Sequence, residues 1–520
     1  MGKGIQCEWK YWITALSKNR QKSVVWDTAF AGNHLCHGRN DEVKKQETLN
    51  NNKMKIQLII FAIGILISNM LFGQDITGQW NGILNVQGTQ LRLVFNISKM
   101  DTGLSSTMDS PDQGAKGIPV TSTSFENQIL KLAVTNLGAE YQGTLDKENV
   151  IVGEFKQRGM SFPLKLSKEM VEKEKPVRPQ EPKKPYSYYE EEVTFENAKA
   201  GIKLAGTLTL PSKEGSFPAV VLITGSGPQN RDEELLGHKP FLVLSDFLTK
   251  NGIAVLRFDD RGTAASNGDF KTATSLDFAS DVEAGVAYLK TRKEVDKKEI
   301  GLIGHSEGGI IAPMVANNFK DIAFIVLLAG TGISGDRLLL LQQELIGKAS
   351  GISDADLQKV KSINIGAFEI IAGSTSVEQL ETDLTSYLKQ VLKDNPNAQK
   401  PQSMSEDDFV KLQVDQIANP WMLFFIKYNP AIALEKVKCP VLAINGEKDL
   451  QVPPKENLEA IKTALTKGGN KKVTTIELPN LNHLFQECKT GSPAEYATIE
   501  QTFSPIALTE ILKWIQMQIN

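Results

Sequence analysis

The sequence predicts two folded units, a small all-β domain followed by an α/β domain with a mostly parallel sheet. Between residues 75 and 167, apolar residues recur at every second position, as in Leu91, Leu93 and Phe95, which is typical of half-buried strands. From residue 186 onward, apolar strands alternate with helical repeats, a pattern that favours a parallel sheet covered by helices on both faces. One of these strands runs into Gly-His-Ser-Glu-Gly at 304–308 and then into a helix.

The composition of the chain excludes some classes of partner. Its 58 Lys and Arg against 61 Asp and Glu give a formal net charge of −3, so the basic surplus of a nucleic-acid-binding protein is missing. The four cysteines, Cys7, Cys36, Cys439 and Cys488, are widely scattered, with no Cys-x-x-Cys, and we therefore expect no metal site and no cofactor. Cys439 and Cys488 could pair in an oxidising compartment, and the sequence leaves this open.

The amino terminus consists of two unlike pieces. Residues 1–53 are polar and without apolar periodicity, and we interpret them as a non-structural upstream extension. Residues 54–73 begin with a methionine and a lysine, contain the apolar run Leu58 to Ile67 and end in Gly73, which is typical of a signal peptide. A short membrane anchor is the alternative, but the run is too short to span a bilayer. We expect a periplasmic or extracellular protein that begins near Gln74 and has no stable membrane anchor.

The region between the predicted signal peptide and the α/β domain has two parts. Residues 75–167 contain about eight turn-bounded strands, which suits a small barrel or sandwich. A ligand-holding barrel is one interpretation, but no cluster of polar residues supports it, so a packed accessory domain is favoured. Residues 168–185 are rich in Lys, Glu and Pro, and their scarcity of apolar side chains predicts a solvated linker.

The pentapeptide at 304–308 has the pattern of a nucleophile elbow. A serine on a sharp strand-to-helix turn needs small neighbours, and Gly304 and Gly308 supply them on both sides of Ser306. The backbone N–H of Glu307 then lies at the start of a helix, where it can stabilise an oxyanion. The glycine-rich loop that follows the strand 217–224 is the expected place for a second donor, and the N–H of Ser226 is the candidate.

Two later strands each end in a residue that can complete a catalytic triad. Asp449 follows the strand 440–444, and His483 follows the strand 472–478. Active-site residues of open parallel sheets gather at the carboxyl ends of the strands, so we expect both to converge on the serine. Glu447 is a rival acid, but Asp449 is preferred because it lies two residues further into the loop, beyond the Gly446 turn. His305 and His238, a residue that we expect to open a helix over 238–251, are interpreted as structural.

Residues 334–433 contain no strand signal and are predicted to form an inserted helical lid. Near its end lies the apolar and aromatic run 421–428. Trp421, Phe424 and Phe425 are the candidates for lining a substrate pocket, although packing of this helix against the core is the safer interpretation for most side chains of the run.

Four motifs together give the α/β domain a specific resemblance. They are Gly-Ser-Gly-Pro-Gln-Asn-Arg-Asp at 225–232, Arg-Phe-Asp-Asp-Arg-Gly at 257–262, Gly-His-Ser-Glu-Gly-Gly at 304–309 and Gly-Glu-Lys-Asp-Leu-Gln-Val-Pro at 446–453. Residues 186–520 resemble the secreted bacterial α/β-hydrolases grouped with serine aminopeptidase-like and dienelactone hydrolase-like esterases. The resemblance implies an α/β-hydrolase fold and a serine hydrolase, usually of carboxylic esters. One departure is Ala264-Ala265, where relatives usually carry glycine.

The sequence therefore predicts a serine hydrolase that cleaves small-molecule carboxylic esters through an acyl-enzyme intermediate. A peptidase that removes amino-terminal residues uses the same triad, but it must also bind a free ammonium group with carboxylates. The candidates for that role are Glu233, Glu234, Glu307, Glu344, Glu378 and Glu381. A non-catalytic binding protein on a hydrolase scaffold is the third possibility, which the presence of all three triad residue types disfavours.

Overall fold

The computed structural model describes residues 75–86, 89–101, 103–157, 160–171, 177–395 and 404–519. The predicted upstream extension and the predicted signal peptide lie outside these residues, so both stay predictions, as does export. Within the described ranges, no helix combines the length and the apolar character needed to cross a lipid bilayer.

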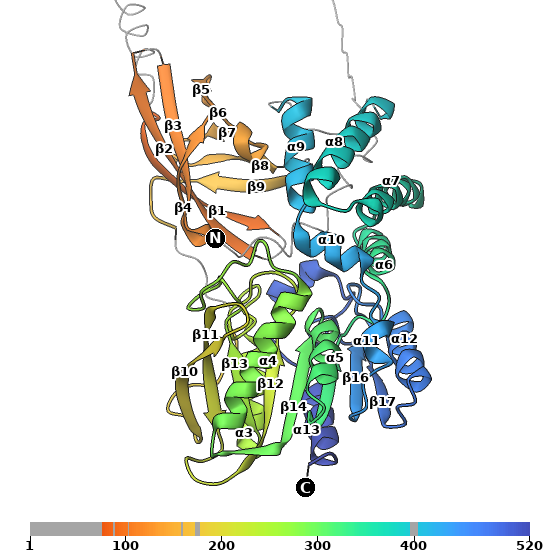
Figure 1. Ribbon diagram of the computed structural model, residues 1–520. Coiled ribbons are helices and arrows are strands. Elements are labelled where there is room, and N and C mark those ends of the chain that lie inside the picture. Colours follow the sequence, from red (N-terminus) through yellow and green to blue (C-terminus); the bar gives the residue numbers. More distant parts are fainter. Residues whose placement is uncertain are drawn as a thin grey trace, which may run out of the picture.

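The amino-terminal unit consists of two antiparallel sheets around a shared core (Figure 1). Trp80, Phe95 and Tyr141 are fully buried in that core, and backbone hydrogen bonds between Asn81 and Ser167 join the two sheets. The nine strands, against about eight expected, are β1 (Gly78–Val86), β2 (Thr89–Met100), β3 (Gly103–Ser110), β4 (Ala115–Val120), β5 (Ser122–Glu126), β6 (Ile129–Val134), β7 (Ala139–Leu145), β8 (Ile151–Gln157) and β9 (Met160–Leu166). Two short 3₁₀ helices, Pro111–Gln113 and Thr135–Leu137, lie in its turns. The predicted all-β domain is confirmed.

The second unit is built on one eight-stranded sheet with the order β10-β11-β13-β12-β14-β15-β16-β17. Its strands are β10 (Tyr189–Asn197), β11 (Ile202–Leu210), β12 (Phe217–Ile223), β13 (Ala254–Phe258), β14 (Val295–His305), β15 (Phe324–Leu328), β16 (Val441–Gly446) and β17 (Val473–Leu478). The strands from β13 to β17 pair in parallel, and β10 and β11 add an antiparallel edge. The predicted α/β-hydrolase fold with its mostly parallel sheet is confirmed.

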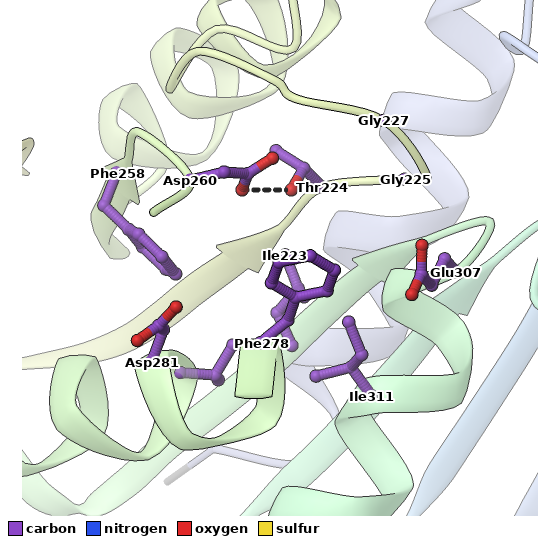
Figure 2. A pocket seen from close by; sticks show the side chains of 11 residues that line it. Ile223, Thr224, Gly225, Gly227, Phe258, Asp260, Phe278, Asp281, Glu307 and Ile311 are labelled. Carbon is purple, nitrogen blue, oxygen red and sulfur yellow. Dashed lines mark hydrogen bonds between the residues drawn. The ribbon is translucent and has the colours of Figure 1, made fainter. Parts of the chain in front are cut away.

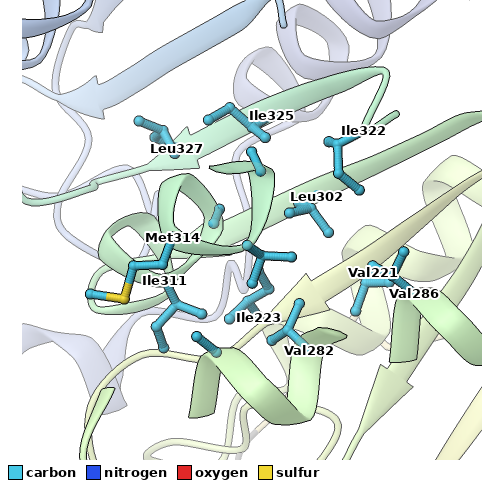
Figure 3. Close-up of a cluster of buried hydrophobic side chains, with 14 of the residues drawn as sticks. Val221, Ile223, Val282, Val286, Leu302, Ile311, Met314, Ile322, Ile325 and Leu327 are labelled. Carbon is cyan, nitrogen blue, oxygen red and sulfur yellow. The ribbon is translucent and has the colours of Figure 1, made fainter. Parts of the chain in front are cut away.

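Helices cover both faces of this sheet because its central strands are apolar on both sides. Val221 and Ile223 of β12 belong to the cluster on one face, whereas Val220 and Leu222 belong to the cluster on the other. Figure 3 shows the first cluster, in which side chains of two helices meet the strands. The helices on that face are α4 (Ser275–Thr291), α5 (Gly308–Asn318) and α12 (Pro454–Lys467), and those on the other face are α3 (Pro240–Lys250) and α13 (Pro505–Gln516).

An insertion of helices between β15 and β16 forms the predicted lid, which lies above the sheet in Figure 1. Its helices are α6 (Gly335–Ala349), α7 (Asp354–Gly373), α8 (Val377–Asp394), α9 (Glu406–Ile417), α10 (Pro420–Lys427) and α11 (Ala431–Leu434). Ser376 and Ser405 cap the first turns of α8 and α9 by accepting hydrogen bonds from backbone N–H groups. The lid has its own apolar core, centred on residues such as Leu380, Leu384 and Met422.

The described residues 177–185 of the predicted linker are bound to the α/β domain, so the expectation that they form a solvated spacer is wrong. The guanidinium of Arg178 donates to four carbonyl oxygens of the α/β domain, those of Leu236, Gly237, Ala497 and Ile499, at 2.8–3.3 Å. The side-chain amide of Gln180 donates to the carbonyl oxygen of Phe503, and its oxygen accepts the N–H groups of Thr502 and Phe503. We call residues 177–185 the strap. The strap is held on the α/β domain by polar contacts of Arg178 and Gln180.

His238 lies beside this strap, two residues before α3, so the helix begins later than predicted. The imidazole is fully buried, with Nε2 2.9 Å from the carbonyl oxygen of Tyr496 and Nδ1 3.0 Å from the hydroxyl of Thr502. Burial and the nearby charge of Arg178 lower the pKa of His238 from 6.5 to about 4. The neutral imidazole therefore serves a structural role, as the sequence predicted.

A pH-dependent loss of stability follows from this pKa. Between pH 6.5 and pH 4 the unfolded chain binds a proton at His238 that the folded chain does not bind, so acid favours unfolding through this residue. We expect a loss of about 3 kcal/mol in the free energy of unfolding between neutral pH and pH 4. Chemical denaturation of the wild type and of His238→Gln measures it, because the stability of the variant should fall less steeply with acid. Parallel curves would contradict the prediction.

Candidate active site

Ser306 stands on the sharp turn between β14 and α5. Its φ angle is +52° and its N–H donates to the carbonyl oxygen of Leu328 on the neighbouring strand at 2.9 Å. A positive φ is rare for residues other than glycine and marks a strained backbone. Ser306 is also the one partly exposed residue in the otherwise buried segment 300–316. This geometry is that of the predicted nucleophile elbow, with the hydroxyl-bearing residue presented at the surface.

The two glycines of the elbow allow its close backbone approach. A Cβ on Gly304 would collide with the carbonyl group of Gly308, and a Cβ on Gly308 would collide with the carbonyl group of Ile223 on β12. Both clashes are with backbone atoms, which cannot move aside as a flexible side chain could unless the turn itself changes. The spacing of glycines in the motif therefore has a steric cause.

The variant Gly304→Ala should be destabilised by about 1–3 kcal/mol or more, because its methyl group overpacks the turn. Gly373→Ala is the matched control, since a Cβ at that helical position meets no atom within 4 Å and alanine favours a helix. Thermal unfolding of both variants measures the difference. Equal melting temperatures would contradict the steric account of the elbow.

The acid and base of the predicted triad meet at the ends of β16 and β17. Nδ1 of His483 lies 2.8 Å from Oδ2 of Asp449, and both side chains are buried. The other oxygen of Asp449 accepts the backbone N–H groups of Gln451 and Val452, each at 2.8 Å. The rival acid Glu447 instead accepts the N–H of Asn480 at 2.9 Å. The structure thus brings Asp449 to the histidine, in the orientation that fixes its imidazole.

The loop after β12 lies directly against the nucleophile. A Cβ on Gly225 would be 3.3 Å from the Cβ of Ser306, so the next residue, Ser226, follows at the edge of the elbow. Glu307 is the N-cap residue of α5, and an N-cap amide has no acceptor within its own helix. The two predicted oxyanion donors are therefore on the backbone segments that adjoin Ser306.

The Arg-Phe-Asp-Asp-Arg-Gly motif after β13 holds that loop. Asp260 accepts the hydroxyl of Thr224 at 2.7 Å and the N–H of Gln229 at 2.8 Å. Its neighbour Asp259 accepts the guanidinium of Arg231 through both oxygens. Ala264 has a positive φ of +48°, the left-handed conformation that favours glycine. The motif is therefore a scaffold for the loop.

A small cavity lies beneath the loop, next to the start of α5 (Figure 2). Its volume of about 10 Å³ is close to the space that one water molecule needs. Asp260, Asp281 and Glu307 line it, and burial raises the pKa of all three carboxyl groups. The cavity is too small for an organic substrate.

The lid reaches the elbow through Trp421 of α10. Its indole N–H donates to Oε1 of Glu307 at 2.8 Å, and the hydroxyl of Ser275 donates to the same oxygen at 2.6 Å. Phe425 stacks on Trp421 with ring centroids 4.8 Å apart, whereas Phe424 stacks on Tyr428 at 5.1 Å. The structure therefore brings Trp421 to the nucleophile turn. A pocket role for Phe424 and Phe425 stays a prediction.

Sequence reasoning missed the partners of His305. Nδ1 of its imidazole lies 2.9 Å from Oε1 of Glu233, and Nε2 lies 3.0 Å from the carbonyl oxygen of His483. Burial lowers the pKa of His305, but the carboxylate of Glu233, the carbonyl group of His483 and the charge of Asp449 together raise it by more, so that its pKa lies above the ordinary value. A histidine next to the serine in the motif was the only available signal, and it did not indicate the partner 72 residues earlier.

Several candidate carboxylates for an ammonium group already have partners. Glu233 bonds His305 and the N–H of Gly225, and Glu307 bonds Trp421 and Ser275. In the lid, Glu344 pairs with Lys348 and Lys361. Across the described ranges, no group of three or more His, Cys, Asp and Glu side chains is arranged to hold a metal ion. Cys439 and Cys488 are both free thiols.

Comparison with known proteins identifies the family. A sequence profile described as X-Pro dipeptidyl-peptidase (S15 family) matches residues 200–474, which is more than half of the chain. The chain belongs to the S15 family. The matched residues of this S15 chain run from β11 to β17 and include Ser306 and Asp449, whereas His483 follows the matched segment.

Individual relatives of this S15 chain include enzymes of several kinds. Esterase EstD of Thermotoga maritima is 26% identical over 339 residues, which cover 64% of this chain and 68% of that protein. Human acyl-coenzyme A thioesterase 1 is 31% identical, but over 27% of this chain and 30% of that protein. Among solved structures, an esterase of Pyrococcus furiosus is 18% identical, with a TM-score of 0.38 over 67% of this chain and 100% of that one. The chain is thus a member of the α/β serine hydrolases, with esterases among its more distant relatives.

Proposed function

We propose that this chain hydrolyses small carboxylic esters through an acyl-enzyme intermediate on Ser306. The observation that carries the proposal is the arrangement at the carboxyl ends of the strands. Three features meet there: an elbow serine at φ +52°, a histidine bonded to a buried aspartate, and a glycine-containing loop that lies against the serine. These are the nucleophile, the oriented base and the oxyanion donors that acyl transfer needs.

Each residue has a defined role in the proposed reaction. The hydroxyl oxygen of Ser306 attacks the ester carbonyl carbon while Nε2 of His483 accepts its proton, and Asp449 holds Nδ1–H and stabilises the imidazolium. The N–H groups of Glu307 and Ser226 bind the oxyanion. The leaving alkoxide takes the proton from His483, which then activates a water molecule to release the acid. Loss of one oxyanion donor costs roughly 100- to 1,000-fold in kcat.

Ester hydrolysis is favoured over peptide hydrolysis by the state of the carboxylates around the serine. Glu233 and Glu307, the candidates nearest to Ser306, are buried and bonded to protein groups, so neither is available to a substrate ammonium group without losing those bonds. Trp421 adds an aromatic surface at the same turn. Peptide hydrolysis is the second candidate, which the match to the X-Pro dipeptidyl-peptidase profile favours.

One assay distinguishes ester hydrolysis from peptide hydrolysis. Purified protein is offered p-nitrophenyl acyl esters of graded chain length beside aminoacyl and X-Pro p-nitroanilides. We expect turnover of short and medium esters with kcat/KM at least 100-fold above that of every anilide. Efficient cleavage of an anilide with negligible cleavage of all esters would replace the esterase proposal with the peptidase one. No turnover and no fluorophosphonate labelling would favour a non-catalytic binding protein.

The contact between Trp421 and Glu307 gives a prediction about the lid. Trp421→Phe keeps an aromatic ring to stack on Phe425 but removes the N–H donor from a buried carboxyl group. Loss of such a bond should lower the free energy of unfolding by about 1–3 kcal/mol. Ser275→Ala, which removes the other donor, should have a comparable effect. Denaturant unfolding measures both, and a Trp421→Phe protein as stable as the wild type would contradict a bonded lid.

A further inference from the structure

Glu233 and His305 form a buried pair behind the nucleophile that the reaction steps above do not use. Oε1 of Glu233 lies 2.9 Å from Nδ1 of His305 and also accepts the N–H of Gly225 at 2.7 Å. Nε2 of His305 lies 3.0 Å from the carbonyl oxygen of His483. We propose that Glu233 and His305 are positioning residues that fix the oxyanion loop and the main chain of the catalytic histidine in one hydrogen-bonded unit. The inference rests on the proposed function, because it concerns the same site.

The pair connects three segments that are distant in the sequence. Glu233 lies in the loop after β12, at a φ of +50°, and its side chain is 6% exposed. His305 is the last residue of β14 and directly precedes the nucleophile, and its ring packs on that of His483 with centroids 4.8 Å apart. A shift of any one segment therefore disturbs hydrogen bonds to the other two.

The chemistry of the partners determines the protons of His305. A carbonyl oxygen only accepts, so Nε2 must carry a hydrogen that it donates to the carbonyl of His483. An ionised carboxylate also only accepts, and Oε1 of Glu233 already receives the N–H of Gly225. Nδ1 must then carry a hydrogen as well. With Glu233 ionised, the pair is an imidazolium and a carboxylate, a state that the raised pKa of His305 favours.

Glu233→Gln cannot reproduce this arrangement, although the two side chains have nearly the same shape. If the amide oxygen faces Gly225 and His305, the imidazolium is left buried without a counter-charge. If the imidazole loses its Nδ1 proton, it needs the amide NH₂ as its donor, and the N–H of Gly225 then loses its acceptor. The first state destabilises the pair that holds the loop, and the second releases the Gly225 end of the loop that carries Ser226. Displacements of about 1 Å near the reacting atoms can cost about 100-fold in rate.

The first test is the rate at which a fluorophosphonate labels Ser306, which needs no knowledge of the substrate. We expect Glu233→Gln to lower this rate, and kcat on p-nitrophenyl esters, by 10- to 100-fold while KM changes less than threefold. Glu192→Gln is the matched control, because its exposed carboxylate bonds Arg231 of the same loop from outside and its loss should leave the rate unchanged. A folded Glu233→Gln protein that labels as fast as the wild type overturns the inference.

The second test counts the protons on His305 in the wild type and does not depend on catalysis or on a stable variant. With histidine-selective ¹⁵N labelling, both ring nitrogens of His305 should carry protons at pH 7.5. One protonated nitrogen overturns the pair as described. If the wild type fails to label with the fluorophosphonate, the proposed function is wrong, and the proton count still decides whether Glu233 and His305 are paired.

Discussion

Ser306→Ala should lose nearly all hydrolysis, with kcat on p-nitrophenyl esters lower by on the order of 10⁴- to 10⁶-fold. The substitution removes the only atom that forms the acyl bond, and the oxyanion donors can supply only a small residual acceleration. Alanine has the same backbone requirements as serine at a φ of +52°, so the elbow and the fold should persist. The measurement is steady-state turnover together with fluorophosphonate labelling of the purified proteins.

Ser362→Ala is the control for this experiment. Its hydroxyl is exposed on α7 and bonds the carbonyl oxygen of Gln358 within the same helix. This variant should label and turn over like the wild type. Undiminished labelling of Ser306→Ala would mean that another serine is the nucleophile and that the motif at 304–308 is a plain turn.

The nucleophile turn and the acid–base pair could be predicted from sequence because they depend on local geometry. Glycines on both sides of Ser306 are a steric requirement of the turn, and the structure shows the clashes that they avoid. Asp449 and His483 follow adjacent parallel strands, β16 and β17, and parallel strands place their carboxyl ends at one edge of the sheet. Strand order and turn chemistry were therefore enough to predict which residues meet.

Contacts between buried polar groups could not be predicted in the same way. The composition of residues 168–185 indicated solvation because apolar side chains are few, yet Arg178 is held by carbonyl oxygens, and such acceptors exist on every residue. Glu233 was one of six candidate carboxylates, and nothing in its sequence context showed that it would face His305. Periodicity reports apolar burial, whereas a polar partner depends on tertiary positions.

Asp449→Asn should lower kcat by about 10⁴-fold while the protein stays folded. One oxygen of Asp449 accepts the N–H groups of Gln451 and Val452, so the asparagine oxygen should keep those two bonds. Its NH₂ group then faces Nδ1 of His483 and donates to it. The imidazole proton moves to Nε2, the atom that must accept the proton of Ser306, so the histidine is held in the tautomer that cannot act as a base.

The rival carboxylate provides the matched control for Asp449→Asn. Glu447 lies two residues earlier in the same loop and accepts the N–H of Asn480, so Glu447→Gln should keep an acceptor for that bond and retain activity within about threefold. Both variants are compared by kcat and by the rate of fluorophosphonate labelling, because both quantities depend on His483 accepting the proton of Ser306. If Glu447→Gln were inactive and Asp449→Asn active, the acid of the triad would be Glu447. The buried bond of 2.8 Å between Asp449 and His483 predicts the opposite result.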